Sequence, residues 1–116
     1  MIELVLTLST QQLCYAEVCA TVSVGCEETP TRPGTYSIKS ILLNPLPVSP
    51  LNGLSYSADY LGGKVITFEN TNFALHGWHN QTSIGKDCSL GCARVPKDFL
   101  DDIIYTYLWN NLIIKP

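Results

Sequence analysis

Charged residues and long apolar runs are both scarce in this chain. Only 15% of its 116 residues are charged, whereas 46% are hydrophobic. That balance provides enough apolar side chains for a packed core and argues against intrinsic disorder. No apolar run approaches the ~20 residues that a membrane-spanning helix requires. We therefore expect a folded protein without a membrane span.

Basic residues are also few. The seven Lys and Arg are scattered, and the formal net charge is -3. Without a basic stripe to neutralise a phosphate backbone, nucleic acid is not expected as a partner. Residues 1–8 carry Glu3 inside an apolar stretch and lack the basic start of a signal peptide. They are interpreted as mature protein, so an extracytoplasmic site of action would need another export route, a removed signal or delivery by a phage.

Strong helix formers are rare, with five Ala and one Met, whereas Val, Ile and Thr together number 26. This composition favours strands over helices. The length suits one compact domain over residues 1–116, with a mostly β fold.

Alternation and turn residues locate the elements. Residues 99–107 carry apolar side chains at helical spacing, behind acidic residues that favour a helix N-terminus. Residues 44–63 are rich in Pro, Gly and Ser and predict an irregular connection. The expected strands cover residues 2–8, 13–15, 18–24, 35–43, 64–69, 73–76 and 112–115.

The five cysteines cannot all pair within the chain, so at least one thiol is left over. A two-residue turn at Ala16-Glu17 would set Cys14 opposite Cys19 on neighbouring strands. We expect these two residues to be in contact, and a disulfide between them is geometrically possible.

Three chemistries can be drawn from His76, His79, Cys88 and Cys92. Zinc is the first, but His-x2-His is short for a structural site, so no metal is predicted. In the second, His76 is a core histidine and Cys92 a small buried apolar residue. In the third, Cys92 is a nucleophile whose proton is taken by His76, two residue types that are usually distant in sequence. Gly91 would let the backbone before Cys92 turn sharply and approach a substrate.

Residues 76–95, HGWHNQTSIGKDCSLGCARV, resemble the active-site stretch of the L,D-transpeptidase (YkuD-like) catalytic domain family. The shared features are a His-Gly pair, a mid-loop Ile-Gly and a Ser-x-Gly-Cys-x-Arg motif at matching spacing. Upstream, residues 22–25 (VSVG) and 29–38 (TPTRPGTYSI) are similar to two further family segments. The resemblance covers nearly the whole chain.

The resemblance implies a mostly β, sandwich-like domain with one helix after the catalytic cysteine. It also implies that Cys92 forms an acyl-enzyme with a peptidoglycan stem peptide, with His76 as the base and the Gly77 carbonyl orienting the imidazole. No cofactor is implied. The residues expected to shape the oxyanion and substrate pocket are Ser89, Gly91, Arg94, Leu90 and Trp78. Arg94 would either brace the loop or meet a substrate carboxylate.

One departure from the family pattern concerns Leu90, which stands where the family most often has His. Leu90 can neither donate nor accept a hydrogen bond, so any role of a second histidine is lost, while His76 keeps the base position. The expected function is a cysteine-dependent peptidoglycan L,D-transpeptidase, by cross-linking or D-Ala release. The alternatives are a peptidoglycan hydrolase or carboxypeptidase with the same residues, and a non-catalytic wall-binding or virion-associated domain. The acyl acceptor and the oligomeric state stay open.

Overall fold

The computed structural model describes residues 3–26, 30–43, 64–78, 80–86, 89, 91–106 and 109–116. Within these residues the chain is mostly strand with one α-helix, which confirms the predicted fold class. The strands form one strongly curled sheet in the order β3-β2-β1-β8-β4-β5-β6-β7. The elements are β1 (Leu4–Thr7), β2 (Gln12–Tyr15), β3 (Val18–Thr21), β4 (Gly34–Leu43), β5 (Lys64–Phe68), β6 (Ala74–His76), the 3-10 helix η1 (Gln81–Ser83), β7 (Ala93–Arg94), α1 (Lys97–Thr106) and β8 (Asn111–Lys115).

The first three strands form the antiparallel meander that the alternating pattern predicts. Leu4 and Leu6 of β1 and Leu13 of β2 are fully buried, while their neighbours in sequence are partly exposed. The C-terminal strand β8 pairs with β1 in parallel. The burial of alternate leucines therefore fixes which face of this part of the sheet meets the core.

The third strand is shorter than predicted, since β3 ends at Thr21 and does not continue to residue 24. After β3 the chain separates from β2, the partner of β3, and runs to β7. There Ser23 forms an isolated antiparallel bridge with Arg94. The Ser23 amide donates to the Arg94 carbonyl at 3.1 Å, and the Arg94 amide donates to the Ser23 carbonyl at 2.9 Å. Residues 22–25 thus connect the meander to the far end of the sheet.

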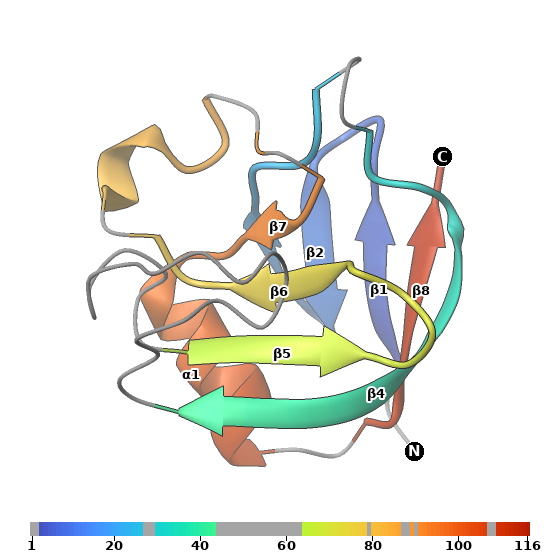
Figure 1. Cartoon of the computed structure of the whole chain (residues 1–116). Helices are drawn as coiled ribbons and strands as arrows, with labels where there is room; N and C mark the ends of the chain where they lie inside the picture. The colour runs from blue at the N-terminus through green and yellow to red at the C-terminus, as the bar shows by residue number, and fades with distance from the viewer. Residues whose placement is uncertain are drawn as a thin grey trace.

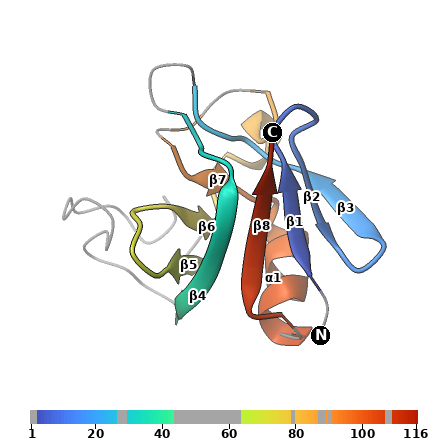
Figure 2. The same cartoon turned by 90° about the vertical axis from the view of Figure 1, so that its right-hand side faces the viewer.

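The ten-residue strand β4 joins the two parts of the sheet. Its first half, from Gly34 to Ser37, pairs with β8, and its second half pairs with β5. The register shifts between Ile38 and Ser40, which is the signature of a β-bulge, and bulges bend strands. As a result β5 and β6 run across the direction of β1 and β8 (Figure 1), and β4 lies beside β8 in the turned view (Figure 2).

The core lies between the curled sheet and α1. The helix begins just after Pro96 and buries one face, formed by Phe99, Leu100, Ile103 and Ile104. These side chains pack in one cluster with residues from both parts of the sheet. The predicted helix is therefore confirmed, although its expected end at residue 107 lies outside the described residues. The indole of Trp109 donates to the Ile103 carbonyl at 3.0 Å and ties the segment after the helix to the core.

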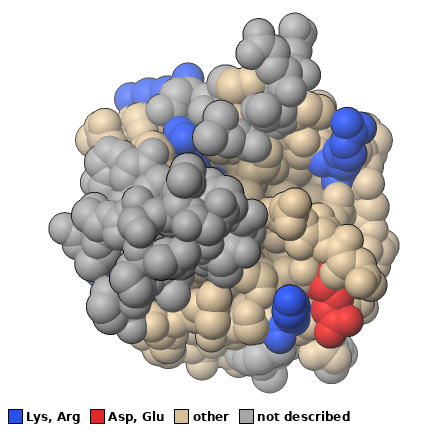
Figure 3. Space-filling view, viewed as in Figure 1, with Lys and Arg blue, Asp and Glu red and all other residues tan. Residues whose placement is uncertain are grey.

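Basic side chains are spread over the surface. On the face shown in Figure 3, the Lys and Arg side chains of the described residues lie apart from one another. Among those residues, no helix is long and apolar enough to cross a membrane.

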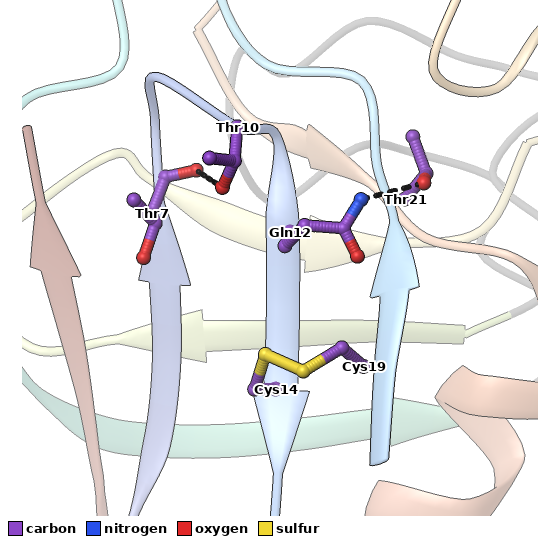
Figure 4. Close-up of a disulfide and its surroundings, with 6 residues drawn as sticks. All are labelled: Thr7, Thr10, Gln12, Cys14, Cys19 and Thr21. Carbon is purple, nitrogen blue, oxygen red and sulfur yellow. Dashed lines mark hydrogen bonds between the residues drawn. A yellow bond between two sulfur atoms is a disulfide. The ribbon is translucent and has the colours of Figure 1, made fainter.

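A disulfide joins Cys14 of β2 to Cys19 of β3 (Figure 4). The two residues are register partners, as are Tyr15 and Val18 next to the turn. Ala16 takes a positive φ of 56°, which allows the chain to reverse over two residues. The Cα atoms of the two cysteines are 4.0 Å apart, so both the expected contact and the bond are confirmed.

We predict that replacing both cysteines, Cys14→Ser with Cys19→Ser, lowers the free energy of unfolding by roughly 2 kcal/mol. The reason is that the bond closes a short loop and removes conformations from the unfolded chain. Urea unfolding without reductant measures the change, and Cys92→Ser is the control, because Cys92 is a free thiol. A double variant as stable as the wild type would contradict a contribution of the disulfide to stability.

Candidate active site

The pairing of β6 with β7 brings His76 and Cys92 to one face of the sheet. The two strands are parallel, with Leu75 opposite Ala93 and His76 opposite Arg94. Leu75 and Ala93 point into the main core. Because side chains alternate along a strand, His76, Arg94 and Cys92 project on the other side. The predicted base and nucleophile, sixteen positions apart in sequence, therefore lie on the same face of this strand pair.

His76 is buried, with 5% of its surface exposed, and its Nδ1 lies 2.6 Å from the carbonyl oxygen of Gly77. A carbonyl only accepts, so Nδ1 carries the proton and Nε2 of the neutral ring is left as an acceptor. Burial lowers the pKa of His76 from 6.5 to about 4; the hydrogen bond to Gly77 opposes this shift, and the charge of Arg94 adds to it. His76 is thus a neutral imidazole at neutral pH.

Cys92 is a half-buried free thiol directly before β7. Burial raises the pKa of the Cys92 thiol, while a hydrogen bond from the Ala74 backbone and the charge of Arg94 partly oppose that rise. Its sulfur also lies 3.7 Å from the Asn72 carbonyl oxygen. A thiol with a raised pKa is protonated at neutral pH, so it needs a base before it can act as a nucleophile. A neutral imidazole with a free Nε2 is a base of the required kind.

The backbone before Cys92 is held by Ser89. Its buried hydroxyl donates to the Cys92 carbonyl and accepts a hydrogen bond from the Gly91 amide at 3.2 Å. Gly91 takes a φ of +124°, a conformation that side chains other than glycine rarely adopt. The sharp turn expected at Gly91 is therefore present, and Ser89 closes it.

A second hydroxyl, that of Thr31, fixes the same turn from the other side. Its Oγ1 donates to the Gly91 carbonyl at 2.7 Å and accepts from the Gly25 amide at 2.9 Å. Thr31 is buried, with 6% of its surface exposed. Thr31 is not among the residues that the sequence predicts for the site, although it lies in the family-like segment 29–38. The available signal is a hydroxyl residue in a short segment flanked by Pro30 and Pro33. The resemblance of this segment to the family does not predict which groups Thr31 contacts.

Arg94 stacks on Trp78. The guanidinium carbon lies 3.6 Å from the centroid of the indole ring, which is a cation–π contact. The Arg94 backbone also pairs with Ser23 and lies opposite His76. Of the two roles expected for Arg94, this arrangement favours bracing the site over meeting a substrate.

A cavity of about 340 Å³ opens beside the Cys92 thiol. Cys92 and Gly91 line it, whereas Ser89, Arg94, Trp78 and His76 do not. Most of its walls come from two segments that the sequence analysis did not assign to the site, before β4 and before β6. The lining residues are Pro30, Thr31, Arg32, Tyr36, Thr71, Asn72, Phe73, Gly91 and Cys92.

Three residues considered in the sequence analysis, His79, Cys88 and Leu90, lie outside the described residues. The zinc alternative depended on two of them. Within the described part of the chain, no group of three or more His, Cys, Asp or Glu is placed to hold a metal ion.

Comparison with known proteins defines the class. The sequence profile of the L,D-transpeptidase catalytic domain (YkuD) matches residues 4–107 of the chain. The chain therefore belongs to the L,D-transpeptidase catalytic domain family. No curated protein sequence matches it significantly.

Solved structures share the fold at low sequence identity. An Enterococcus faecium L,D-transpeptidase aligns with a TM-score of 0.75 and 14% identity, over 97% of this chain and 49% of that one. Mycobacterium tuberculosis L,D-transpeptidase 3, solved with a faropenem-derived adduct, gives 0.71 and 14%, over 99% and 60%. The isolated catalytic domain of the E. faecium protein gives 0.70 and 14%, over 98% and 96%. The chain thus spans about half of the longer proteins and nearly all of the isolated domain.

We predict that the stability of the protein depends on pH through His76. The unfolded chain binds a proton below pH 6.5, but the folded protein binds it only near pH 4. The stability that the neutral ring contributes is therefore complete above pH 6.5 and is lost as the pH falls to 4, by roughly 3 kcal/mol. Urea unfolding between pH 7 and pH 4 measures the loss, and His76→Gln, which cannot take up this proton, should show a smaller slope. Equal slopes would mean that His76 is not buried as a neutral ring.

We also predict that Thr31→Val lowers the free energy of unfolding by about 2 kcal/mol, because it leaves the Gly91 carbonyl and the Gly25 amide without their partner. Amide hydrogen exchange at Gly25 should become faster. Thr35→Val makes the same chemical change at an exposed position and serves as the matched control. If both variants lost the same small amount of stability, the hydrogen bonds of Thr31 would not contribute to the free energy of unfolding as predicted.

Proposed function

We propose that this protein is a cysteine-dependent L,D-transpeptidase that acts on peptidoglycan stem peptides through an acyl-enzyme at Cys92. The proposal depends above all on the His76 imidazole, whose Nδ1 is held by the Gly77 carbonyl at 2.6 Å on the sheet face that also carries Cys92. Membership of the family supports the reaction class.

In the first step, Nε2 of His76 takes the thiol proton while the Cys92 sulfur attacks the carbonyl of the third stem residue. A carbon–sulfur bond forms and the carbonyl oxygen becomes an oxyanion. The bond to the D-Ala nitrogen then breaks, and the leaving amine receives the proton from His76. The products of this half-reaction are free D-Ala and a thioester on Cys92.

The oxyanion needs donors near Cys92. The Cys92 amide has no hydrogen-bond acceptor among the described residues, and it follows the Gly91 turn that Ser89 and Thr31 hold rigid. The Gly91 amide, in contrast, is directed to the Ser89 hydroxyl. We therefore assign the Cys92 amide as an oxyanion donor, with Ser89 and Gly91 as positioning residues.

The charge of Arg94 has two consequences for this reaction. Burial is the main cause that lowers the pKa of His76, and the charge of Arg94 adds to this shift. Burial raises the pKa of Cys92, and the same charge opposes that rise and so favours the thiolate as it forms. The stacking of Arg94 on Trp78 holds the charge at a fixed position. The single charge of Arg94 thus influences the pKa of both reacting groups, His76 and Cys92.

In the second half-reaction, an amine of another stem peptide or a water molecule attacks the thioester carbonyl and gives its proton to Nε2 of His76. The carbon–sulfur bond then breaks, and His76 returns the proton to the sulfur, so that Cys92 is again a thiol. An amine gives a cross-link, and water gives a shortened stem. Family members act on the cell wall, so we place the site of action outside the cytoplasm. The Cys14–Cys19 disulfide supports that placement, because disulfides persist in oxidising surroundings.

We predict that Cys92→Ala abolishes turnover of a tetrapeptide-bearing muropeptide and that His76→Ala slows acylation by ~10²–10⁴-fold, the usual contribution of a general base. Mass spectrometry of the products measures both, and also separates a cross-link from a shortened stem. Wild-type protein exposed to a carbapenem should gain the mass of one adduct, on Cys92. A relative was solved with an adduct derived from faropenem, which is also a β-lactam, and this makes a β-lactam probe a reasonable choice.

The controls keep a failure to fold apart from a loss of chemistry. Both variants should remain folded at pH 7, with a cooperative melting transition and the circular dichroism spectrum of the wild type. If wild type and Cys92→Ala leave the muropeptide equally untouched while both bind it, the chain is a wall-binding domain instead. Hydrolysis without any cross-link would make it a carboxypeptidase.

A further inference from the structure

Arg32 is the one formally charged side chain among the described residues that line the cavity beside Cys92. The other lining residues are neutral, with hydroxyl, amide and aromatic groups among them. A small cavity with a single cation on its wall favours an anionic ligand group. The side chain is exposed, so an incoming ligand can reach it without any rearrangement of the core.

The backbone at Arg32 is fixed on both sides. The preceding residue, Thr31, is bonded to the Gly91 carbonyl at 2.7 Å, which places this segment directly against the turn that carries Cys92. On the other side, the Tyr36 hydroxyl donates to the Arg32 carbonyl at 2.6 Å. The Arg32 backbone is therefore anchored at the wall of the cavity, and only side-chain freedom is lost when the guanidinium binds a ligand.

Arg32 has no carboxylate partner within salt-bridge distance among the described residues, where the ion pair is Lys64–Asp101. Arg94 is in a different position, because its guanidinium stacks on Trp78 and it does not line the cavity. The cation available to a ligand beside Cys92 is thus Arg32, and a guanidinium binds a carboxylate in a bidentate manner.

We propose that Arg32 is a specificity-determining residue that binds a carboxylate of the stem peptide in the cavity beside Cys92; this inference rests on the proposed function. The C-terminal carboxylate of the leaving D-residue is attached to the carbon next to the scissile nitrogen. When the scissile carbonyl sits at the sulfur, that carboxylate lies within one residue's length of it. A side-chain carboxylate of the third residue is the other source of the same chemistry.

Three synthetic peptides separate these sources. The first, L-Ala-γ-D-isoglutamine-L-Lys-D-Ala, carries its only carboxylate at the C-terminus. The second is its C-terminal amide, which has none. The third is the same amide with diaminopimelate in place of Lys. Dissociation constants are measured by calorimetry in a Cys92→Ala background, so that binding is observed without turnover.

Arg32→Gln should weaken binding of the first peptide by about five- to tenfold, a range that reflects a charge-assisted contact reduced by solvent exposure. It should leave the second peptide unchanged. Arg32→Lys should lie between, since it keeps the charge and loses the bidentate geometry. The matched control is Lys39→Gln, which removes an exposed positive charge on β4 outside the cavity.

Weakening of the third peptide instead of the first supports the carboxylate site and assigns it to the third residue. Equal weakening of all three peptides, or an effect no larger than that of Lys39→Gln, overturns the assignment of Arg32. Turnover of the first peptide with intact Cys92 is scored separately. If the peptide is turned over but Arg32→Gln does not affect binding, the proposed function is supported and the role of Arg32 is wrong. If Arg32→Gln weakens binding but no turnover is observed, the carboxylate site is supported and the proposed enzymatic function is wrong.

Discussion

The change of register in β4 is the constraint on which the rest of the structure depends. This strand pairs with β8 up to Ser37 and with β5 from Ile38 on, and its register with β5 shifts just after Ile38, so the sheet must curl. The curl closes the sheet around α1 and brings β7 back to the segment after β3, where Ser23 pairs with Arg94. A flat sheet of the same strands would leave β7 at an open edge, with its backbone groups unpaired.

The closure of this edge explains why two very short strands can carry a site. β6 and β7 have three and two residues, and neither would persist alone. They are held because Ser23, Ser89 and Thr31 provide hydrogen bonds from outside the strands. All three partners are buried, so their bonds do not compete with water. The rigidity near Cys92 thus comes from polar contacts between segments that are distant in sequence.

The protonation states of His76 and Cys92 are determined more by burial than by interaction with charged partners. The pKa of His76 is lowered and that of Cys92 is raised mainly because both groups lose water, so the neutral forms of both are favoured. A neutral thiol beside a neutral base differs from a preformed thiolate–imidazolium pair. A neutral pair avoids a permanent buried charge pair, and under the proposed mechanism the proton moves only when a substrate is attacked.

Local patterning determined much of this protein by itself. Alternating leucines predicted β1 and β2, the two-residue turn predicted that Cys14 meets Cys19, and apolar spacing predicted α1, because these features depend on neighbours within a few residues. The motif around His76 and Cys92 likewise indicated the family. Only the tertiary structure decided that β3 ends early, that Thr31 bridges to Gly91 and that Arg32 reaches the cavity. Those features depend on contacts between residues about 60 positions apart, and it is the bend in β4, not any local spacing, that brings them together.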